Sequence, residues 1–423
     1  TSSGNLLSYY RFNSGTGSTL VDKSGNSNNG TISGASFFHY APLGTGSDNT
    51  APTVLRVFST NGTYGIDDVI AIKCVFDEAV TVTGTPQLTL ETGDTDAVVD
   101  YTSGSGSIFL TFNYTVASGH TSSDLDYTST SALALNSGTI KDAAGNAATL
   151  TLASPGASKS LGSSNAIVID GNVPTISSVS LASDNSTIAV TFSEAVYTTT
   201  DAATALVVGD FAFSISGGTA TLSSATPSSI SISSNVYTLG ISLSGTPDGG
   251  ETLTVNPASA TAIYDAADNA AAASQSNNTA TLNDKAAPSF ATDYPATANV
   301  AGTSFDLKLK INEGGKGYYV VLADNATAPT ATEVKAGTGS SAATAVKSGN
   351  SSLTADTEAS ITVTDLSSET AYDIYVVAED DESTPNVQSS VSKLEITTPD
   401  ITAPTVSSVT SSTADGSYKI GDV

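Results

Sequence analysis

One short step recurs along this 423-residue chain at nearly constant intervals and limits what the chain can fold into. An Asp stands four residues before a Pro at Asp48 to Pro52, Asp170 to Pro174, Asp284 to Pro288 and Asp400 to Pro404. These prolines lie 122, 114 and 116 residues apart, which is the size of one β-sandwich domain. We therefore interpret each step as a joint at which one domain ends and the next begins.

The composition supports strands and argues against one class of partner. Thr, Ser, Gly, Ala and Asn make up much of the chain, and 39% of its residues are hydrophobic, so alternating runs can build sheets with cores. Only 14 Lys and Arg face 41 Asp and Glu. The net charge of −27 repels nucleic acid and anionic membrane surfaces, and it attracts divalent cations. We expect no nucleic-acid partner.

The chain contains no Met and no apolar run near the ~20 residues that cross a bilayer, so we expect an internal piece of a longer protein without a membrane span. No signal peptide or anchor can be read from it. A single cysteine, Cys74, excludes an internal disulfide framework and a Cys-based zinc site. Ile72, Cys74 and Phe76 share one face of an expected strand, so we predict a buried core thiol.

Residues 1–47 combine an apolar segment, Leu6 to Phe12, with the turn Asp22-Lys23-Ser24-Gly25-Asn26-Ser27-Asn28-Asn29-Gly30. This combination resembles the opening of the laminin-G and concanavalin-like lectin domains of bacterial surface proteins. In that family the turn can sit near calcium and the sheet can bind sugar. The resemblance covers roughly 40 residues, far fewer than a complete domain, so we predict a fragment with a structural role.

Two motifs recur in the same order in residues 48–171, the first module, and residues 172–285, the second module. The segment Val75-Phe76-Asp77-Glu78-Ala79-Val80 returns as Thr191-Phe192-Ser193-Glu194-Ala195-Val196. The segment Asp142-Ala143-Ala144-Gly145-Asn146-Ala147-Ala148 returns as Asp265-Ala266-Ala267-Asp268-Asn269-Ala270-Ala271. Two distant motifs in one order indicate homologous repeats.

Alternation predicts strands in these modules. In the first module Ile108, Leu110, Phe112, Tyr114 and Val116 alternate with mostly polar residues, as in a half-buried strand of an antiparallel sheet. The two recurring motifs are similar to those of the bacterial Ig-like repeats strung along giant surface proteins and adhesins. The resemblance covers both modules and implies immunoglobulin-like sandwiches.

Residues 401–423 resemble the start of the first module again. The segment Thr402 to Val406 matches Thr50 to Val54, and Tyr418 to Val423 matches Tyr64 to Val69. We interpret 401–423 as the start of a further Ig-like repeat. Because it is too short to form a core, we expect it to be poorly supported.

Residues 286–400, the third module, carry a different pattern. The runs Phe305 to Ile311 and Gly317 to Leu322 suggest strands, the second of them central. The segment from Leu366 to Ala378 has the form L-x-x-x-x-T-x-Y-x-I-x-V-x-A, which is similar to the E to F corner of fibronectin type III domains. That resemblance implies that the Tyr372 hydroxyl bonds back to nearby backbone. The whole chain is thus predicted to be all-β, with tandem immunoglobulin-like and fibronectin III-like β-sandwiches in an extended string.

The joints bring acidic residues together. In an immunoglobulin-like sandwich the chain enters at the end that carries the loops after the second and sixth strands. Glu78 and Glu194 follow a second-strand pattern and Asp142 and Asp265 lie in a late loop, so each can approach an entering joint residue, Asp48 or Asp170. Calcium takes six to eight oxygen ligands, so the candidate calcium ligands are Asp48, Glu78, Asp142, Asp170, Glu194 and Asp265.

A second interpretation of these acids stays open. Asp and Gly-Asn are ordinary turn formers, Pro simply starts a strand, and a Glu can accept hydrogen bonds from loop amides. The run Glu379-Asp380-Asp381-Glu382 is expected near Asp284, as a solvated acidic loop by default and as a cation site in the alternative.

Catalysis finds little support. His39 lies in an aromatic run and His120 in a turn-like segment, and the sequence contains no Ser-His-Asp arrangement, H-E-x-x-H motif or phosphate loop. We therefore predict that the chain is not an enzyme.

Two hypotheses of function remain. The first is a structural stalk or filament segment of a giant extracellular bacterial surface protein, an adhesin or appendage that bears load or projects from the cell. Its partners would be neighbouring repeats and a possible homo-oligomeric bundle. The second is an adhesive module that binds a cell-surface glycan or protein. Glycan binding by residues 1–171 without self-association would favour the second hypothesis.

Overall fold

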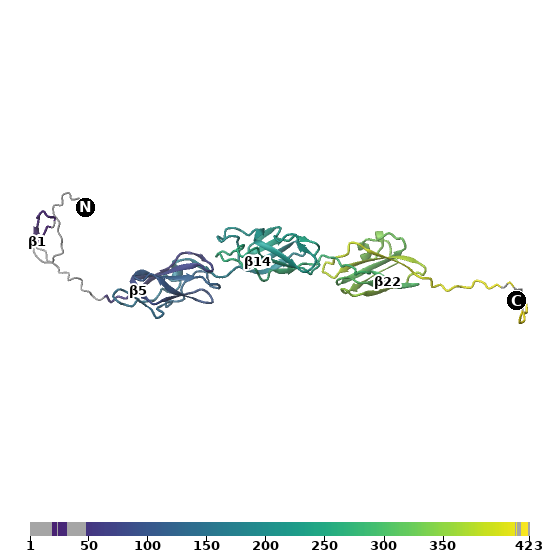
Figure 1. Ribbon diagram of the computed structural model, residues 1–423, viewed down its shortest axis with the longest axis horizontal. Helices are drawn as coiled ribbons and strands as arrows, with labels where there is room; N and C mark the ends of the chain where they lie inside the picture. Colours follow the sequence, from purple (N-terminus) through teal and green to yellow (C-terminus); the bar gives the residue numbers. More distant parts are fainter. Residues whose placement is uncertain (1–18, 23, 32–47, 411, 413–415, 422–423) are drawn as a thin grey trace. The chain divides into compact units, whose positions relative to one another are not determined.

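The computed structural model describes residues 19–22, 24–31, 48–410, 412 and 416–421 (Figure 1). Nearly all of its regular structure is strand, and each module has a hydrophobic core of its own. The predicted all-β class with tandem β-sandwiches is confirmed. By packing the chain divides into two compact units, Thr1–Val173 with Thr199–Ala203 and Tyr264–Asn269, and Pro174–Thr198 with Thr204–Ile263 and Ala270–Val423.

The first module is organised around one long strand, β5. Its elements are β3 (Val54–Phe58), β4 (Gly62–Tyr64), β5 (Val69–Thr83), β6 (Gln87–Leu90), β7 (Ala97–Ser103), β8 (Ser107–Thr115), β9 (Thr121–Ser122), β10 (Leu133–Ala134), β11 (Thr139–Lys141), α1 (Leu161–Ser164) and β12 (Ile167–Asp170). One sheet has the order β10-β6-β7-β8-β5-β11 with β3 beside β5, and a smaller sheet has the order β4-β12-β9.

The predicted burial along β8 is confirmed except at its start. Leu110, Phe112, Tyr114 and Val116 are buried in the core, but Ile108 is 37% exposed. The register between β5 and β8 shifts after the pair Val75 and Phe109, so Ile108 lies at an irregularity where the alternation no longer points its side chain into the core.

The second module is built from shorter strands. Its elements are β13 (Ile176–Leu181), β14 (Thr187–Phe192), η1 (Val208–Asp210), β15 (Phe211–Ser216), β16 (Thr221–Leu222), β17 (Ile230–Ser233), β18 (Val236–Gly240), β19 (Leu243–Ser244), β20 (Thr252–Pro257) and β21 (Thr279–Thr281). The sheets have the orders β13-β14-β18-β17 and β15-β20-β21, with a small β16-β19 pair. Phe192, Phe211 and Tyr237 pack together in the core.

The third module carries a helix on its larger sheet. Its elements are β22 (Ala296–Ala301), β23 (Ser304–Leu309), β24 (Gly315–Ala323), α2 (Ala331–Ala336), η2 (Ser340–Ala342), β25 (Lys347–Leu353), β26 (Ala359–Val363), β27 (Ala371–Asp380) and β28 (Ser392–Thr397). The sheets have the orders β22-β23-β26 and β25-β24-β27-β28, so the expected central position of β24 is confirmed. Tyr372 accepts a hydrogen bond from the Ser367 N–H at 2.9 Å, as the fibronectin-like corner implies.

The two ends of the chain add little regular structure within the described residues. β1 (Thr19–Leu20) pairs with β2 (Gly30–Thr31) around a turn in which the Asp22 carboxylate accepts the N–H groups of Ser24 and Asn28 at 2.8 and 3.0 Å. Most of residues 1–47, including Leu6 to Phe12 and His39, lie outside the described residues, so the lectin-like resemblance stays a prediction. Residues 401–410 form no strand, and Val406 and Val409 are 80% and 90% exposed, as expected for a segment without a core.

Candidate metal centres at the module joints

All three modules begin with the same pair of hydrogen bonds. The residue after the joint Pro donates its N–H to the side chain of a residue that lies within β5 or follows β14 or β23, and its carbonyl oxygen accepts that residue's N–H in return. The pairs are Thr53 with Asp77 (2.8 and 3.1 Å), Thr175 with Ser193 (3.0 and 2.8 Å) and Ser289 with Asn312 (2.6 and 3.1 Å). In every module the next residue is a Glu, namely Glu78, Glu194 or Glu313. The contact therefore fixes where that Glu emerges relative to the joint.

The first joint brings together the three predicted residues Asp48, Glu78 and Asp142. One carboxylate oxygen from each lies within 4.8 Å of those of the other two. Asp48 precedes β3 and is exposed, Glu78 comes from the middle of β5 and is half-buried, and Asp142 follows β11 and is buried. Residues nearly a hundred positions apart thus present carboxylates to one point.

An Asn holds the late-loop Asp and the joint at the same time. Asn146 donates its backbone N–H to Asp142 Oδ1 at 2.8 Å, and its Nδ2 donates to Asp142 Oδ2 at 2.7 Å. The same Nδ2 donates to the Asp48 carbonyl oxygen at 2.8 Å. This Asn clamp ties the joint backbone to the loop and leaves the Asp142 carboxylate in a fixed orientation.

The carboxylates of the first joint affect one another electrostatically. Partial burial and then the charges of Asp48 and Asp142 raise the pKa of Glu78 above its ordinary value. Burial also acts to raise the pKa of Asp142, but the hydrogen bonds from Asn146 outweigh it, so that pKa is lowered. At the first joint the ionised form of Asp142 is therefore stabilised, whereas the ionised form of Glu78 is disfavoured.

The second joint repeats the Asn clamp. The equivalent residues are Asp170, at the end of β12, Glu194, which follows β14 in the second compact unit, and Asp265. In the first unit, Asn269 donates its N–H and Nδ2 to the Asp265 carboxylate at 2.9 and 2.8 Å. Its Nδ2 also donates to the Asp170 carbonyl oxygen at 2.8 Å. Asp265 is fully buried, and that burial raises its pKa despite the hydrogen bonds.

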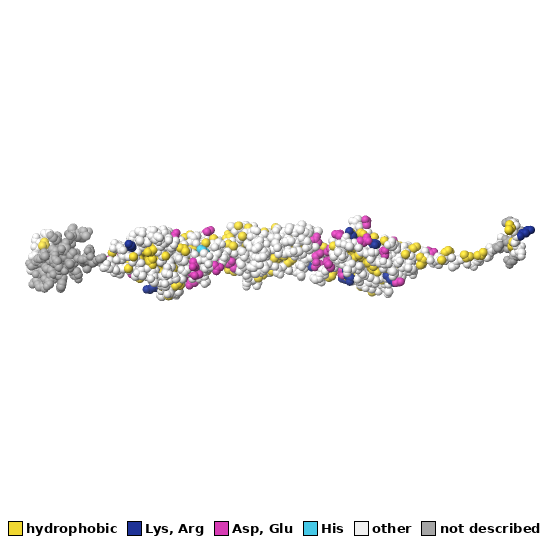
Figure 2. Space-filling view, turned by 90° about the horizontal axis from the view of Figure 1, so that it is seen from below, with side chains coloured by type: hydrophobic (Ala, Val, Ile, Leu, Met, Phe, Trp, Pro, Cys, Tyr) yellow, Lys and Arg dark blue, Asp and Glu magenta, His cyan; other side chains and the backbone are white. Residues whose placement is uncertain are grey.

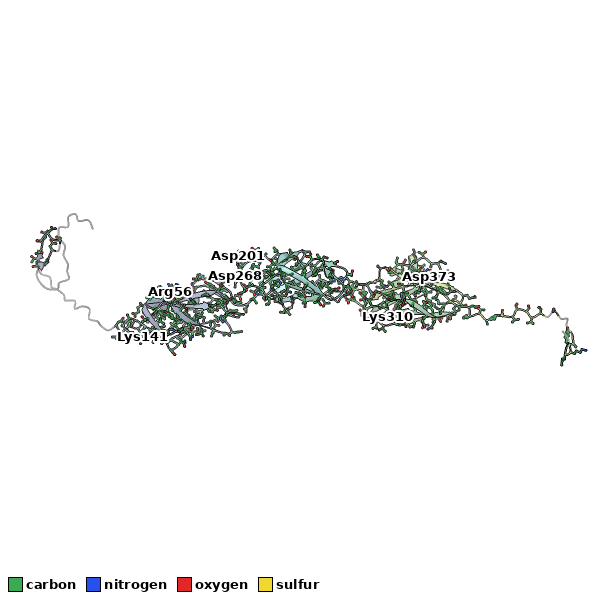
Figure 3. All side chains as sticks on the ribbon, in the orientation of Figure 1. Arg56, Lys141, Asp201, Asp268, Lys310 and Asp373 are labelled. Carbon is green, nitrogen blue, oxygen red and sulfur yellow. The ribbon has the colours of Figure 1, made fainter. Side chains whose placement is uncertain are left out.

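Further acids lie on the same loop. Asp268 is exposed, but slight desolvation by its neighbours raises its pKa, and the charges of Asp68 and Asp201 raise it further. Asp201 and Asp268 are labelled next to each other in Figure 3. This part of the first unit therefore carries a local concentration of negative charge beside the Asn269 clamp.

The third joint has the same arrangement in the fibronectin-like module. Asp284, Glu313 and Asp380 each present a carboxylate oxygen within 4.8 Å of the other two. Asn386 donates its N–H and Nδ2 to the Asp380 carboxylate at 2.8 and 2.7 Å, and its Nδ2 also approaches the Asp284 carbonyl oxygen at 3.4 Å. The clamp spans six residues here, from Asp380 to Asn386, instead of the four of the other modules.

Glu313 shows the strongest electrostatic effect of the three joints. Burial raises its pKa to about 7, with further contributions from the charges of Asp284 and Asp380 and from a hydrogen bond to Asp284. The ionised form of Glu313 is therefore disfavoured at neutral pH unless a cation lies close enough to stabilise it.

The expected solvated loop at Glu379 to Glu382 is wrong for its first two residues. Glu379 and Asp380 are only 6% and 3% exposed, because β27 extends through both of them. Glu379 accepts the Tyr318 hydroxyl and forms an ion pair with Lys335 of α2, so it fastens the helix to the sheet. The Asp380 carboxylate lies instead beside those of Asp284 and Glu313 at the third joint.

Sequence reasoning missed Glu313, although a signal for it exists. Glu78 and Glu194 each stand two residues after a core Phe, and Glu313 stands two residues after the core residue Ile311. The intervening residues, Asp77, Ser193 and Asn312, all accept the N–H of the residue after the joint Pro. A search for an apolar residue, a short polar residue and Glu would have found it.

The first and third groups have the chemistry of a hard-cation site. Three carboxylates, with joint carbonyl oxygens near them, supply the ligand type that calcium prefers, and calcium accepts flexible geometry with six to eight oxygens.

Comparison with known proteins gives fold-level likenesses only. No family model and no curated protein matches the chain. Among solved structures, titin fragment I67–I69 covers 83% of this chain and 98% of its own length at 10% identity and a TM-score of 0.30. Titin domains A168–A170 cover 83% of this chain and 99% of their own length at 10% identity and a TM-score of 0.26. Domains FN1–FN3 of chicken CNTN1 cover 83% of this chain and 99% of their own length at 11% identity and a TM-score of 0.22.

Among the described residues, no helix has the length and apolar character needed to cross a membrane.

Proposed function

We propose that this chain is a structural segment of a giant extracellular bacterial surface protein, and that calcium bound at its joints stiffens the string of modules. The observation that carries this proposal is the repetition of one joint design in all three modules, including the fibronectin-like one. Each has an Asp before the joint Pro, a Glu two residues after a buried apolar residue and a late Asp held by an Asn. Ordinary turns do not require this set of three acids.

The proposed ligands are three carboxylates at each joint. They are Asp48, Glu78 and Asp142 at the first joint and Asp284, Glu313 and Asp380 at the third. Asp170, Glu194 and Asp265 stay the ligands that the sequence predicts for the second joint. Backbone oxygens and water would supply the remaining ligands of a calcium ion. Burial and then repulsion between the carboxylates raise the pKa values of Glu78 and Glu313, and bound calcium would offset both effects by stabilising the ionised forms.

The mechanical role follows from what the proposed ion would connect. At the first joint it would link Asp48, which precedes the module, to β5 and to the loop after β11. Such a link removes the freedom of the short segment between Asp48 and Pro52 that otherwise acts as a hinge. Force applied along the chain would then pass through strand ladders, which carry load through their hydrogen bonds.

The location and partners belong to the same proposal. The array would stand at the bacterial cell surface or be secreted, project an adhesive or otherwise specialised end, and have neighbouring repeats as its first partners. Chains of this kind can also associate side by side into a bundle. The alternative of a glycan- or protein-binding adhesive module rests on residues 1–47 and stays a sequence hypothesis.

Calcium titration of the full chain tests the proposal. Isothermal titration calorimetry should show about three sites with Kd values on the order of 0.1–1 mM, the range of extracellular calcium modules. Small-angle scattering should show a narrower distribution of dimensions with calcium than with chelator. Asp142→Asn and Asp380→Asn should each remove one site. Asp324→Asn should remove none, because Asp324 is exposed and follows the end of β24 opposite to Glu313.

Two results would overturn the calcium joints. One is the absence of both heat and a change in dimensions. The other is a stoichiometry that stays constant in the Asp142 and Asp380 variants, which would place any bound calcium elsewhere. In either case the joints would be held by the Asn clamps and strand contacts alone.

A further inference from the structure

One sheet of the second module ends in a strand, β17, that is paired on one side only. The order β13-β14-β18-β17 leaves β17 at the edge, and no other strand of the described chain pairs with it. Ser231, Ile232 and Ser233 are exposed, and the exposed fraction of the Ile232 side chain is 44%. An open edge presents unpaired backbone groups that can take another strand.

This edge lacks the usual protection against such pairing. Proteins guard edges with charged side chains, Pro or bulges. β28 carries Lys393 and Glu395, and β3 has Arg56 and a register shift. β17 has none of these, and its register with β18 is regular.

The absence of charge extends well beyond the strand. The nearest charged residues along the chain are Asp210 and Asp248, and residues 172–284 contain no Lys or Arg. The surrounding part of the chain is mostly white and yellow on the face drawn in Figure 2. Two copies of a chain with net charge −27 repel each other over most of their surface. The 37 uncharged residues from Phe211 to Pro247 form a region where two copies can meet without facing like charges.

The hairpin register shows which groups are free at this edge. β17 and β18 are joined by a two-residue turn, Ser234 and Asn235, with the pair Ser233 and Val236 at its base. Such a turn is closed by a hydrogen-bonded pair, and hydrogen-bonded and non-hydrogen-bonded pairs then alternate. The N–H and C=O groups of Ile230 and Ile232 therefore point away from β18, toward the open side.

We propose that two copies of this chain pair antiparallel through β17, with Ser231 of one copy opposite Ser231 of the other. Ile230 of each copy then lies opposite Ile232 of its partner, and the free backbone groups of both residues are satisfied. A strand that pairs with itself antiparallel forms a closed two-fold contact, so association stops at a dimer at this edge. The added strand also covers the exposed side of Ile232.

This pairing identifies a surface for the side-by-side association included in the proposed function, and it needs no calcium. Its experiments are therefore run in chelator, so that failure of the calcium joints leaves the result unaffected. The partner is a second copy because the edge offers main-chain groups and small neutral side chains, with no charge or deep pocket to select a different ligand.

Sedimentation equilibrium of the full chain should show a reversible dimer at about 100 µM, since one short strand pair is a small interface. Ser231→Lys places two like charges opposite each other and should weaken the dimer at least tenfold. The matched control is Ser180→Lys on β13, the opposite edge of the same sheet, where Ser180 is also exposed. That control should leave the dimer unchanged.

A crosslink tests the register directly. Opposed non-hydrogen-bonded residues have Cα atoms about 4.5 Å apart, which suits a disulfide. Ser231→Cys should therefore form a covalent dimer under mild oxidation at least tenfold faster than Ser180→Cys, and buried Cys74 does not compete. A monomer at all concentrations, a dimer unaffected by Ser231→Lys, or equal crosslinking rates would each overturn the proposal.

Discussion

At the scale of single residues, burial determines the ionisation behaviour of Cys74 and Glu379 together with their partners. Cys74 is fully buried, as its position between Ile72 and Phe76 predicted, and burial raises the pKa of its thiol to about 12. Glu379 behaves differently from its expected solvated state. Burial favours its neutral form, but Lys335 and Tyr318 outweigh that effect and lower its pKa. A charged side chain in a loop-like run can thus be part of a packed face.

Glu313 should make the third module depend on pH when calcium is absent. Its pKa of about 7 lies above the ordinary value of 4.5, so the folded state binds the proton more tightly than the unfolded state. The resulting stabilisation is complete below pH 4.5 and is lost as the pH rises through 7. Between these values the free energy of unfolding should fall by roughly 1 kcal/mol after allowance for solvent screening.

Thermal unfolding of wild type and Glu313→Gln in chelator, from below to above this range, checks this prediction. The variant should lose part of the pH dependence, and saturating calcium should remove it from the wild type by favouring the ionised carboxylate. Identical slopes for the two proteins would show that Glu313 keeps an ordinary pKa.

At the scale of elements, helix α2 buries the outer face of strand β24, which the alternation of residues along the strand does not predict. β24 is buried on both sides, because its inner face contacts the module core and its outer residues Tyr318, Val320 and Leu322 pack with Val334 of α2. A capping box at Thr330 and Glu333 begins the helix, and Gly337 ends it with a φ of 78°. At six residues the helix depends on this packing.

Lys335 should hold α2 to the sheet through Glu379. Lys335→Met leaves Glu379, whose side chain is 8% exposed, without its cation, and we expect the third module to lose about 2 kcal/mol of unfolding free energy. Lys347→Met is the matched control, because its partner Asp365 is 82% exposed and such surface pairs contribute about 0.5 kcal/mol or less.

Urea unfolding followed by Tyr fluorescence measures both variants, since the chain has no Trp. The double variant Lys335→Met with Glu379→Gln should recover part of the loss, because the unpaired buried charge is gone. Equal effects of the Lys335 and Lys347 substitutions would mean that the buried pair contributes no more than a surface pair.

At the scale of the whole molecule, separate cores imply separate stabilities. Phe192 is fully buried and packs against Phe211 and Tyr237 within the second module. Phe192→Ala should therefore destabilise that module by about 3–5 kcal/mol and leave the unfolding of the third module nearly unchanged. Phe192→Leu, which keeps most of the buried volume, should cost much less.

Differential scanning calorimetry of the full chain checks this prediction. One transition should move to lower temperature in Phe192→Ala while another keeps its position. A common shift of all transitions would show that the modules unfold as one cooperative body, and the joints would then carry more coupling than their contacts suggest.

The amino-acid sequence by itself determined the all-β class, the spacing of the joints, the burial of Cys74 and the acids that gather at the first joint. Alternation, turn residues and repeated motifs are local or periodic signals, and they survive without knowledge of the fold. Only the tertiary structure decided that Asn146, Asn269 and Asn386 clamp the joint backbone, that Glu313 joins Asp284 and Asp380, and that Glu379 is buried under α2. These contacts join residues far apart in the chain, and whether a carboxylate meets water, an amide or another carboxylate depends on how the strands and loops pack.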